Sequence, residues 1–166
     1  MTKQINKKFL FTILIFIFLV LVSAYVIEYK LGHQPCKLCL YERIPYFLSI
    51  LLIVKIFFIK GYEKTTLFTL FLVFIISAMV AFYHFGIEQG FFDESFVCNV
   101  ESQLKILSKE NLLKELNKNI VSCKDVTFRI LGLSLAAINT ILSVVLSIIF
   151  LKLFFNYGSS STSQYK

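Results

Sequence analysis

Four cysteines are the residues of this chain best suited to chemistry, and two of them, Cys36 and Cys39, form a C-x-x-C pair. Two sulfurs at this spacing can meet on one turn, and a nearby cation or helix amino terminus favours the thiolate, which is the reactive form. Arg43 follows Cys39 by one helical turn. A helix that starts between them would place the guanidinium group of Arg43 beside the Cys39 sulfur. The positive end of the helix dipole would lie beside the same sulfur. The spacing therefore predicts a redox-active pair with a stabilised thiolate at Cys39.

The other two cysteines, Cys98 and Cys123, lie in a long polar segment. Four cysteines allow three pairings, and pairing within each segment is the natural one. Chain entropy gives roughly 3.5 kcal/mol for a loop of this size and about 2 kcal/mol for a C-x-x-C ring. A Cys98–Cys123 bridge is thus expected to be a structural staple, and a Cys36–Cys39 bridge to be made for exchange.

Two inert staples and a zinc site are the alternatives for these cysteines. Structural zinc sites commonly use two closely spaced pairs, and only Cys36 and Cys39 are close in the sequence. An oxidising compartment also disfavours free thiolates. No metal site is therefore expected.

The segments that must position the cysteines are strongly apolar. Hydrophobic residues make up 57% of the 166 residues, and the mean hydropathy is +0.77, which excludes an ordinary water-soluble domain. Apolar runs cover about residues 9–27, 40–59, 67–87 and 130–151, and about 20 helical residues cross a bilayer. The second run is long enough only if its helix starts near Leu40. The pattern predicts an all-α integral membrane protein, with one four-transmembrane-helix domain over residues 1–155.

The net charge of +7 is better explained by membrane topology than by nucleic acid, because the lysines gather beside the apolar runs. If the amino terminus is cytoplasmic, the inner side combines a single acid, Glu63, with Lys3, Lys7, Lys8, Lys55, Lys60, Lys64, Lys152 and Lys166. The remaining basic and acidic residues cancel on the outer side. Both termini are then cytoplasmic, and all four cysteines lie outside, where disulfides persist.

Two outer loops are expected, at about residues 28–43 and 88–129. The second carries an amphipathic pattern over residues 101–120, which predicts a helix lying on the membrane surface. Residues 156–166 are expected to form a disordered cytoplasmic tail. A cleavable signal peptide is the competing interpretation of the first apolar run.

His84 and Glu88 are one helical turn apart and share a face near the outer end of the third predicted span. Such a polar pair could line a ligand site, or it could simply cap and hydrate the end of the helix.

Three motifs together resemble the DsbB family of bacterial disulfide-bond formation proteins. The first motif lies in the first outer loop and resembles the corresponding loop of the family: Pro35-Cys36-x-x-Cys39-Leu40-Tyr41-Glu42-Arg43. The second motif resembles the end of the family's third helix: Tyr83-His84-x-Gly86-x-Glu88-Gln89-Gly90. The junction into the fourth helix carries the third motif, Ser122-Cys123-x-Asp125-Val126-x-Phe128-Arg129-x-Leu131-Gly132. With the four spans, the resemblance covers about residues 9–155.

The resemblance implies a bacterial inner-membrane thiol oxidoreductase that sustains disulfide-bond formation. It would re-oxidise a periplasmic, thioredoxin-fold, DsbA-like protein and pass the electrons to a membrane quinone, either ubiquinone or menaquinone. The partner's thiolate would attack Cys98, Cys123 would then attack Cys36, and Cys39 would leave facing the quinone.

The resemblance also implies binding residues for the quinone. Arg43 would stabilise the Cys39 thiolate and the developing quinone anion, while His84 and Glu88 would line the quinone pocket. Glu42 receives no role, and its charge could partly neutralise Arg43.

Two other classes of protein share parts of this pattern. A non-enzymatic four-span scaffold, tetraspanin-like in outline, would have stapled outer loops but would need no C-x-x-C beside a helix start. A vitamin K epoxide reductase-like quinone reductase usually places its C-x-x-C in the last span, where this chain has no cysteine. The placement of the cysteines therefore argues against both.

Overall fold

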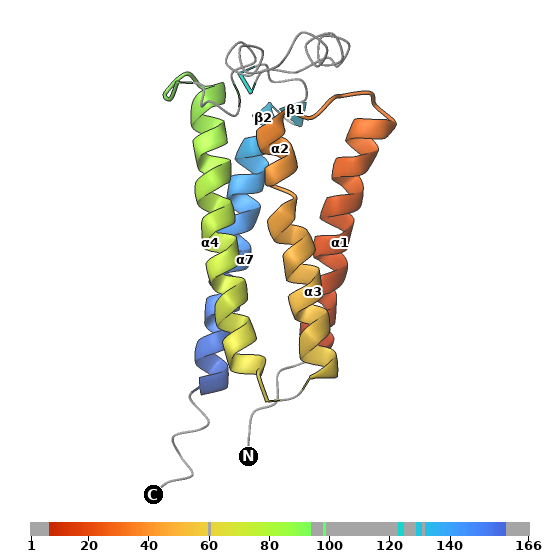
Figure 1. The fold of residues 1–166 in the computed structure, drawn as a ribbon, viewed down its shortest axis with the longest axis vertical. Helices are drawn as coiled ribbons and strands as arrows, with labels where there is room; N and C mark the ends of the chain where they lie inside the picture. The colour runs from red at the N-terminus through yellow and green to blue at the C-terminus, as the bar shows by residue number, and fades with distance from the viewer. Residues whose placement is uncertain are drawn as a thin grey trace, which may run out of the picture.

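The structure, a computed structural model, describes residues 7–59, 61–93, 98, 123–124, 129–130 and 132–158. Its main helices are α1 (Lys7–Tyr29), α3 (Ile44–Phe58), α4 (Glu63–Glu88) and α7 (Leu135–Gly158), which stand side by side as a bundle (Figure 1). The short helix α2 (Lys37–Tyr41) precedes α3, and strands β1 (Arg129–Ile130) and β2 (Leu133–Ser134) precede α7. Helices α1, α4 and α7 are long and apolar enough to cross a membrane. The predicted helical membrane architecture is confirmed to that extent.

The second predicted span, residues 40–59, is not one helix. Helix α2 ends at Tyr41, Glu42 and Arg43 form a turn, and α3 begins at Ile44 with a proline in its first turn. Proline is tolerated there because its missing N–H has no partner in the first turn of a helix. The 15 residues of α3 span about 22 Å, less than the roughly 30 Å hydrocarbon layer. The count of four spans therefore stays a prediction.

The fourth predicted span starts later and ends later than expected. Strands β1 and β2 pair antiparallel, with Arg129 opposite Ser134 and Ile130 opposite Leu133, and Gly132 between them takes a φ of +84°. Helix α7 then continues through Gly158, so the predicted tail begins too early. The last turn stays helical because Tyr157 packs against the core and donates a hydrogen bond of 2.5 Å to Glu63 Oε2. The predicted surface helix and the rest of the tail lie outside the described residues.

The bundle buries one apolar stripe of each helix and leaves large apolar side chains on its outside. On α1 the buried residues recur at helical spacing, namely Leu10, Ile13, Ile17 and Leu21. Phe74 of α4 stacks on Phe150 of α7 at the centre, with ring centroids 5.6 Å apart. Outward-facing phenylalanines and leucines are more than one-third exposed along α1, α4 and α7. This distribution fits helices that are surrounded by lipid.

Helices α4 and α7 make the most extensive helix pair, and small residues allow their close approach. The hydroxyl groups of Ser77 and Ser143 lie 3.1 Å apart in the buried interface, and Ala81 and Ala137 are buried on the same two helices. Small residues let helix backbones come together in a membrane, and a polar pair between helices adds about 0.6 kcal/mol on average.

Replacing Ser143 with leucine should lower the midpoint of thermal unfolding in detergent, because the buried α4–α7 interface has no room for the larger side chain. Overpacking of this kind costs about 1–3 kcal/mol. The control is Val144→Leu on the neighbouring residue, which is 43% exposed on the lipid-facing side and should leave the midpoint unchanged. Equal midpoints for the two variants would contradict this account of the interface.

Candidate active site

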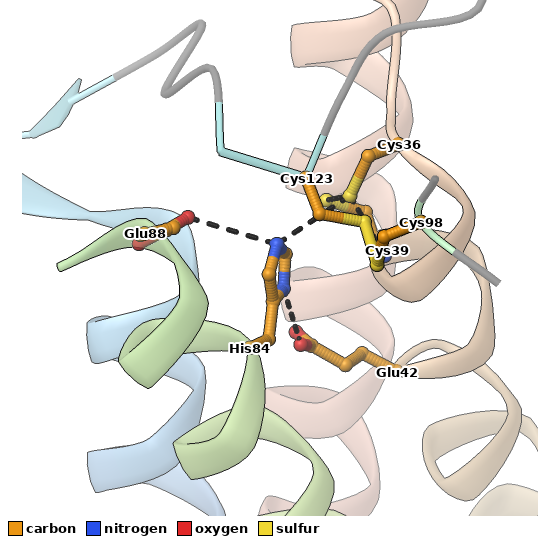
Figure 2. Close-up of a disulfide and its surroundings, with 7 residues drawn as sticks. All are labelled: Cys36, Cys39, Glu42, His84, Glu88, Cys98 and Cys123. Carbon is orange, nitrogen blue, oxygen red and sulfur yellow. Dashed lines mark hydrogen bonds and ion pairs between the residues drawn. A yellow bond between two sulfur atoms is a disulfide. The ribbon is translucent and has the colours of Figure 1, made fainter. Parts of the chain in front are cut away.

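All four cysteines gather at one end of the bundle, the end that carries α2 and the hairpin (Figures 1 and 2). Cys98 and Cys123 form a disulfide, which confirms the predicted pairing within the second loop. Cys36 and Cys39 are thiols, with their sulfur atoms 2.9 Å apart. Cys36, Cys98 and Cys123 are buried in one cluster, and Cys39 packs against it. The fold thus brings together two pairs that are distant in the sequence.

Cys36 lies at the amino end of α2 and receives several hydrogen bonds. The backbone N–H of Cys39 donates to its sulfur at 3.3 Å, and Nε2 of His84 lies 3.4 Å from the same atom. The hydrogen bond from the Cys39 thiol, helped by His84, outweighs burial and lowers the pKa of Cys36 from 9.0 to about 5. Cys36 is therefore a thiolate at neutral pH.

The pKa values of the two thiols of the pair shift in opposite directions. The pKa of Cys39 is raised because its thiol donates to Cys36, because it is buried, and because the negative charges of Cys36 and Glu42 lie nearby. The prediction of a stabilised thiolate at Cys39 is wrong for this state of the protein. Helix α2 begins at Lys37, so Cys36 and not Cys39 occupies the helix start.

Arg43 has a different partner from the one predicted. Its Nη1 lies 2.5 Å from Oε2 of Glu28, and its guanidinium group lies 4.9 Å from the centre of the Tyr25 ring. The break after Tyr41 interrupts the helical register that would have brought Arg43 to the face of Cys39. The expected neutralisation of Arg43 by Glu42 is also wrong, since Glu28 provides the pairing charge.

Glu42 instead forms the centre of a buried polar chain, although the sequence suggested no role for it. It is 7% exposed, and its Oε1 lies 2.7 Å from Nδ1 of His84. Nδ2 of Asn139 donates to Glu42 Oε2 at 2.7 Å, and the Tyr46 hydroxyl donates to Asn139 Oδ1. Asn139 was missed, although an amide within the last apolar run was a usable signal, because polar groups inside a membrane are rare and often functional.

His84 and Glu88 share a face of α4, as predicted. Nε2 of His84 lies 3.7 Å from Oε1 of Glu88, and both side chains are buried. Two glycines of the same motif shape this end of the helix. The ring of Phe92 folds back over Gly86, where an added Cβ would lie 2.2 Å from it, and Gly90 follows the helix with a φ of +77°.

A cavity of about 240 Å³ lies on the other side of Cys39, between α1, the first loop, α3 and α7. Its walls are mainly aliphatic, and Glu28, Cys39, Glu42, Arg43 and Asn139 contribute polar groups to them. A mostly apolar cavity with a few converging polar groups is typical of a small-molecule site. His84 and Glu88 do not line this cavity, so it does not support their prediction as pocket residues.

Three donor atoms of the site are close enough to hold a metal ion. The sulfurs of Cys36 and Cys39 and a ring nitrogen of His84 all lie within 4.8 Å of one another. The sequence did not suggest this grouping, because His84 is distant along the chain. Structural zinc is almost always four-coordinate, and only three donors meet here among the described residues. The absence of a metal site stays a prediction.

Comparison with known proteins identifies relatives of the chain. The sequence profile of the family described as "Disulfide bond formation protein DsbB" matches residues 6–153. The "Uncharacterized protein RP370" of Rickettsia prowazekii (strain Madrid E) is 32% identical over 164 residues, which cover 96% of this chain and 94% of the relative. No solved structure matches the chain.

The low pKa of Cys36 predicts that the reduced protein is alkylated at this cysteine under mildly acidic conditions. The rate of reaction with iodoacetamide should rise with a midpoint near pH 5, because the thiolate is the nucleophile. Mass spectrometry should find the label on Cys36, while Cys39 stays unmodified.

The ionisable groups that interact with Cys36 are Cys39, His84 and Glu88. Replacing His84 with glutamine removes a hydrogen bond and a positive charge from the thiolate, so the midpoint should move up. A midpoint near the ordinary thiol value of 9.0 in the unmodified protein would contradict the assignment.

Proposed function

The chain belongs to the family of disulfide bond formation protein DsbB, and from this premise we propose that it re-oxidises a periplasmic DsbA-like dithiol protein and passes the electrons to a membrane quinone. Family membership carries thiol oxidoreductase activity in disulfide-bond formation and disfavours the scaffold and vitamin K epoxide reductase alternatives. The observation that carries the rest is the joint burial of both cysteine pairs, one as a disulfide and one as thiols, beside an apolar cavity.

The first half of the reaction is thiol–disulfide exchange. A thiolate of the partner attacks Cys98, and Cys123 leaves. The Cys123 thiolate attacks Cys36 of an oxidised Cys36–Cys39 bridge, and Cys39 leaves. The contact between the two pairs in one buried cluster supports this direct route. The partner's second thiolate then forms its own disulfide and releases Cys98.

The second half restores the Cys98–Cys123 disulfide and leaves Cys36 and Cys39 reduced. Cys98 attacks Cys123 of the Cys36–Cys123 bridge, and Cys36 leaves as a thiolate. A thiol of lower pKa leaves faster, so the pKa of about 5 at Cys36 favours this direction.

The cavity beside Cys39 fits the head group of a lipid quinone. Aliphatic walls suit a substituted ring, and a cavity of about 240 Å³ lies just below the ~300–1,000 Å³ of sites that enclose a whole ligand, as expected if the isoprenoid tail stays in the membrane. Arg43 would hold a ring oxygen, because it is a charged residue in the lining of the cavity. A bound quinone supplies a two-electron acceptor there. In this scheme, His84 helps to lower the pKa of Cys36, and Glu88 pairs with His84.

The charge pattern supports a periplasmic position for the cysteines and a cytoplasmic position for both termini. Helix α1 begins and α7 ends at the end of the bundle that is farthest from α2 and the hairpin (Figure 1). Lys55 and Lys64 lie in the last turn of α3 and the first turn of α4, on the predicted inner side. This arrangement fits the positive-inside pattern of a bacterial inner-membrane protein.

Replacing either Cys36 or Cys39 with serine should abolish quinone reduction by a reduced DsbA-like protein, because each sulfur is needed for the disulfide that delivers the electrons. The control is the pair Cys98→Ser with Cys123→Ser. It should lose turnover with the protein donor, yet its pre-reduced form should still reduce short-chain ubiquinone in a single turnover. Stopped-flow absorbance of the quinone measures both reactions, and retained activity in Cys39→Ser would refute the scheme.

Replacing Arg43 with alanine should raise the KM for short-chain ubiquinone at least tenfold, since a hydrogen bond from a charged group contributes about 1.5–3 kcal/mol. The KM for the DsbA-like donor should change little. The paired change Arg43→Met with Glu28→Gln avoids leaving Glu28 unpaired and should show the same increase. Lys55→Ala removes a cation at the opposite end and serves as the control. A normal quinone KM in the paired variant would show that Arg43 only supports the local structure.

A further inference from the structure

We propose that Glu42 is the proton carrier of the quinone step. It receives, through His84, the proton that belongs to Cys36, and it delivers that proton to the quinone oxygen in the adjoining cavity. This inference rests on the proposed function, because it assigns a role within electron transfer to quinone.

The first support is a continuous hydrogen-bonded path from sulfur to carboxylate. His84 Nε2 lies 3.4 Å from Cys36 Sγ, and His84 Nδ1 lies 2.7 Å from Glu42 Oε1 (Figure 2). The exposed fractions of Cys36, His84 and Glu42 are 6%, 2% and 7%. Protons therefore move between these groups more readily than to bulk water, and an imidazole with a partner on each nitrogen can pass a proton from one to the other.

The second support is that Glu42 contacts His84 and also lines the cavity beside Cys39. Cys36 and His84 do not line the cavity beside Cys39, whereas Glu42 does. Among the described residues, Glu42 is thus the member of the Cys36–His84–Glu42 path that reaches the space proposed for the quinone. Its carboxylate can accept a proton on the side of His84 and release it on the side of the cavity.

The third support is a change in charge that drives the transfer. In the proposed reduced state, His84 carries the proton and lies between Cys36 Sγ and Glu42 Oε1, which hold it from both sides. When the two sulfurs join, the thiolate charge disappears, and a buried cation loses one of its two partners. Charge interactions are strong in such a buried site, so the His84 proton is released toward Glu42.

The overall step is balanced. The bond formed is Cys36 Sγ–Cys39 Sγ, and the bond broken is the S–H bond of Cys39. Two electrons leave the sulfurs for the quinone. Two protons accompany them: the thiol proton of Cys39, which lines the cavity, and the former proton of Cys36, which passes from His84 through Glu42. The products are one disulfide, neutral His84 and quinol.

Asn139 and Tyr46 act as positioning residues for Glu42. The amide of Asn139 holds Glu42 Oε2, and the Tyr46 hydroxyl holds that amide, so Glu42 Oε1 faces His84. Arg43 is paired with Glu28 and does not draw Glu42 away. Other ionisable groups that face His84 are Glu88, at 3.7 Å from Nε2, and the thiol pair itself.

The kinetic test uses the full-length protein in lipid vesicles, reduced with dithiothreitol, freed of reductant and mixed with short-chain ubiquinone. Glu42→Gln should slow quinol formation on the order of 100-fold, the lower end of what general acid–base catalysis contributes. The control is Glu63→Gln, at the opposite end of α4, which should react like the unmodified protein. An unmodified protein that forms no quinol would overturn the proposed function, whereas an equally fast Glu42→Gln would overturn only the proton-carrier role.

A paired change separates proton transfer from local structure. Glu42→Gln with Asn139→Asp keeps the net charge and the complementary hydrogen bond between the two positions, but it removes the carboxylate that contacts His84. Slow quinol formation in this variant is expected. Recovery of the normal rate would show that the charge balance of the site, and not a carboxylate at position 42, is what the reaction needs.

A measurement without quinone follows the proton directly. Oxidation of the reduced protein with ferricyanide, which accepts electrons but no protons, should produce a carboxylic-acid band in the infrared difference spectrum of the vesicles, because Glu42 takes the proton and no acceptor removes it. The band should be lost in Glu42→Gln and retained in Glu63→Gln. A missing band in the unmodified protein, or a persistent band in Glu42→Gln, would contradict the role of Glu42.

Discussion

The site depends on the buried hydrogen-bonded pair of Glu42 and His84. A carboxylate that is 7% exposed needs partners, because burial of an unpaired charge costs several kcal/mol. Glu42 finds them in His84 of α4 and Asn139 of α7, and Tyr46 of α3 completes the chain. One side chain after α2 thereby ties three helices together at the level of the cysteines. The same contacts orient the imidazole toward Cys36.

That orientation explains why two cysteines of one motif differ chemically. Both sulfurs are buried or partly buried, and burial alone would raise the pKa of each thiol. Cys36 escapes this effect, since it accepts hydrogen bonds from the thiol and backbone of Cys39 and lies beside His84. Cys39 keeps its proton, because the pKa of its thiol is raised. The pair is therefore divided into a thiolate that leaves easily and a thiol that faces the cavity.

The packing of the four main helices shapes the site. Small residues at the α4–α7 interface, such as Ser77 and Ser143, let those helices meet closely. Helices α1 and α3 are joined at the cysteine end through the Arg43–Glu28 ion pair, and the cavity remains between them and α7. A short helix α2 with a break after Tyr41 separates the sulfurs from Arg43. The turn at that break contributes Glu42 to the polar chain and both Glu42 and Arg43 to the lining of the cavity.

Periodicity and spacing in the sequence determined the helical membrane character and the shared face of His84 and Glu88, because these features depend on local geometry or on composition. The sequence favoured the Cys98–Cys123 pairing among three possible ones, and the structure contains it. The tertiary structure alone decided which cysteine is the thiolate and what Glu42 does. A pKa depends on groups within a few ångströms, and His84 and Asn139 reach Glu42 across 42 and 97 positions of the chain. No local pattern encodes such contacts, since the packing of α3, α4 and α7 creates them.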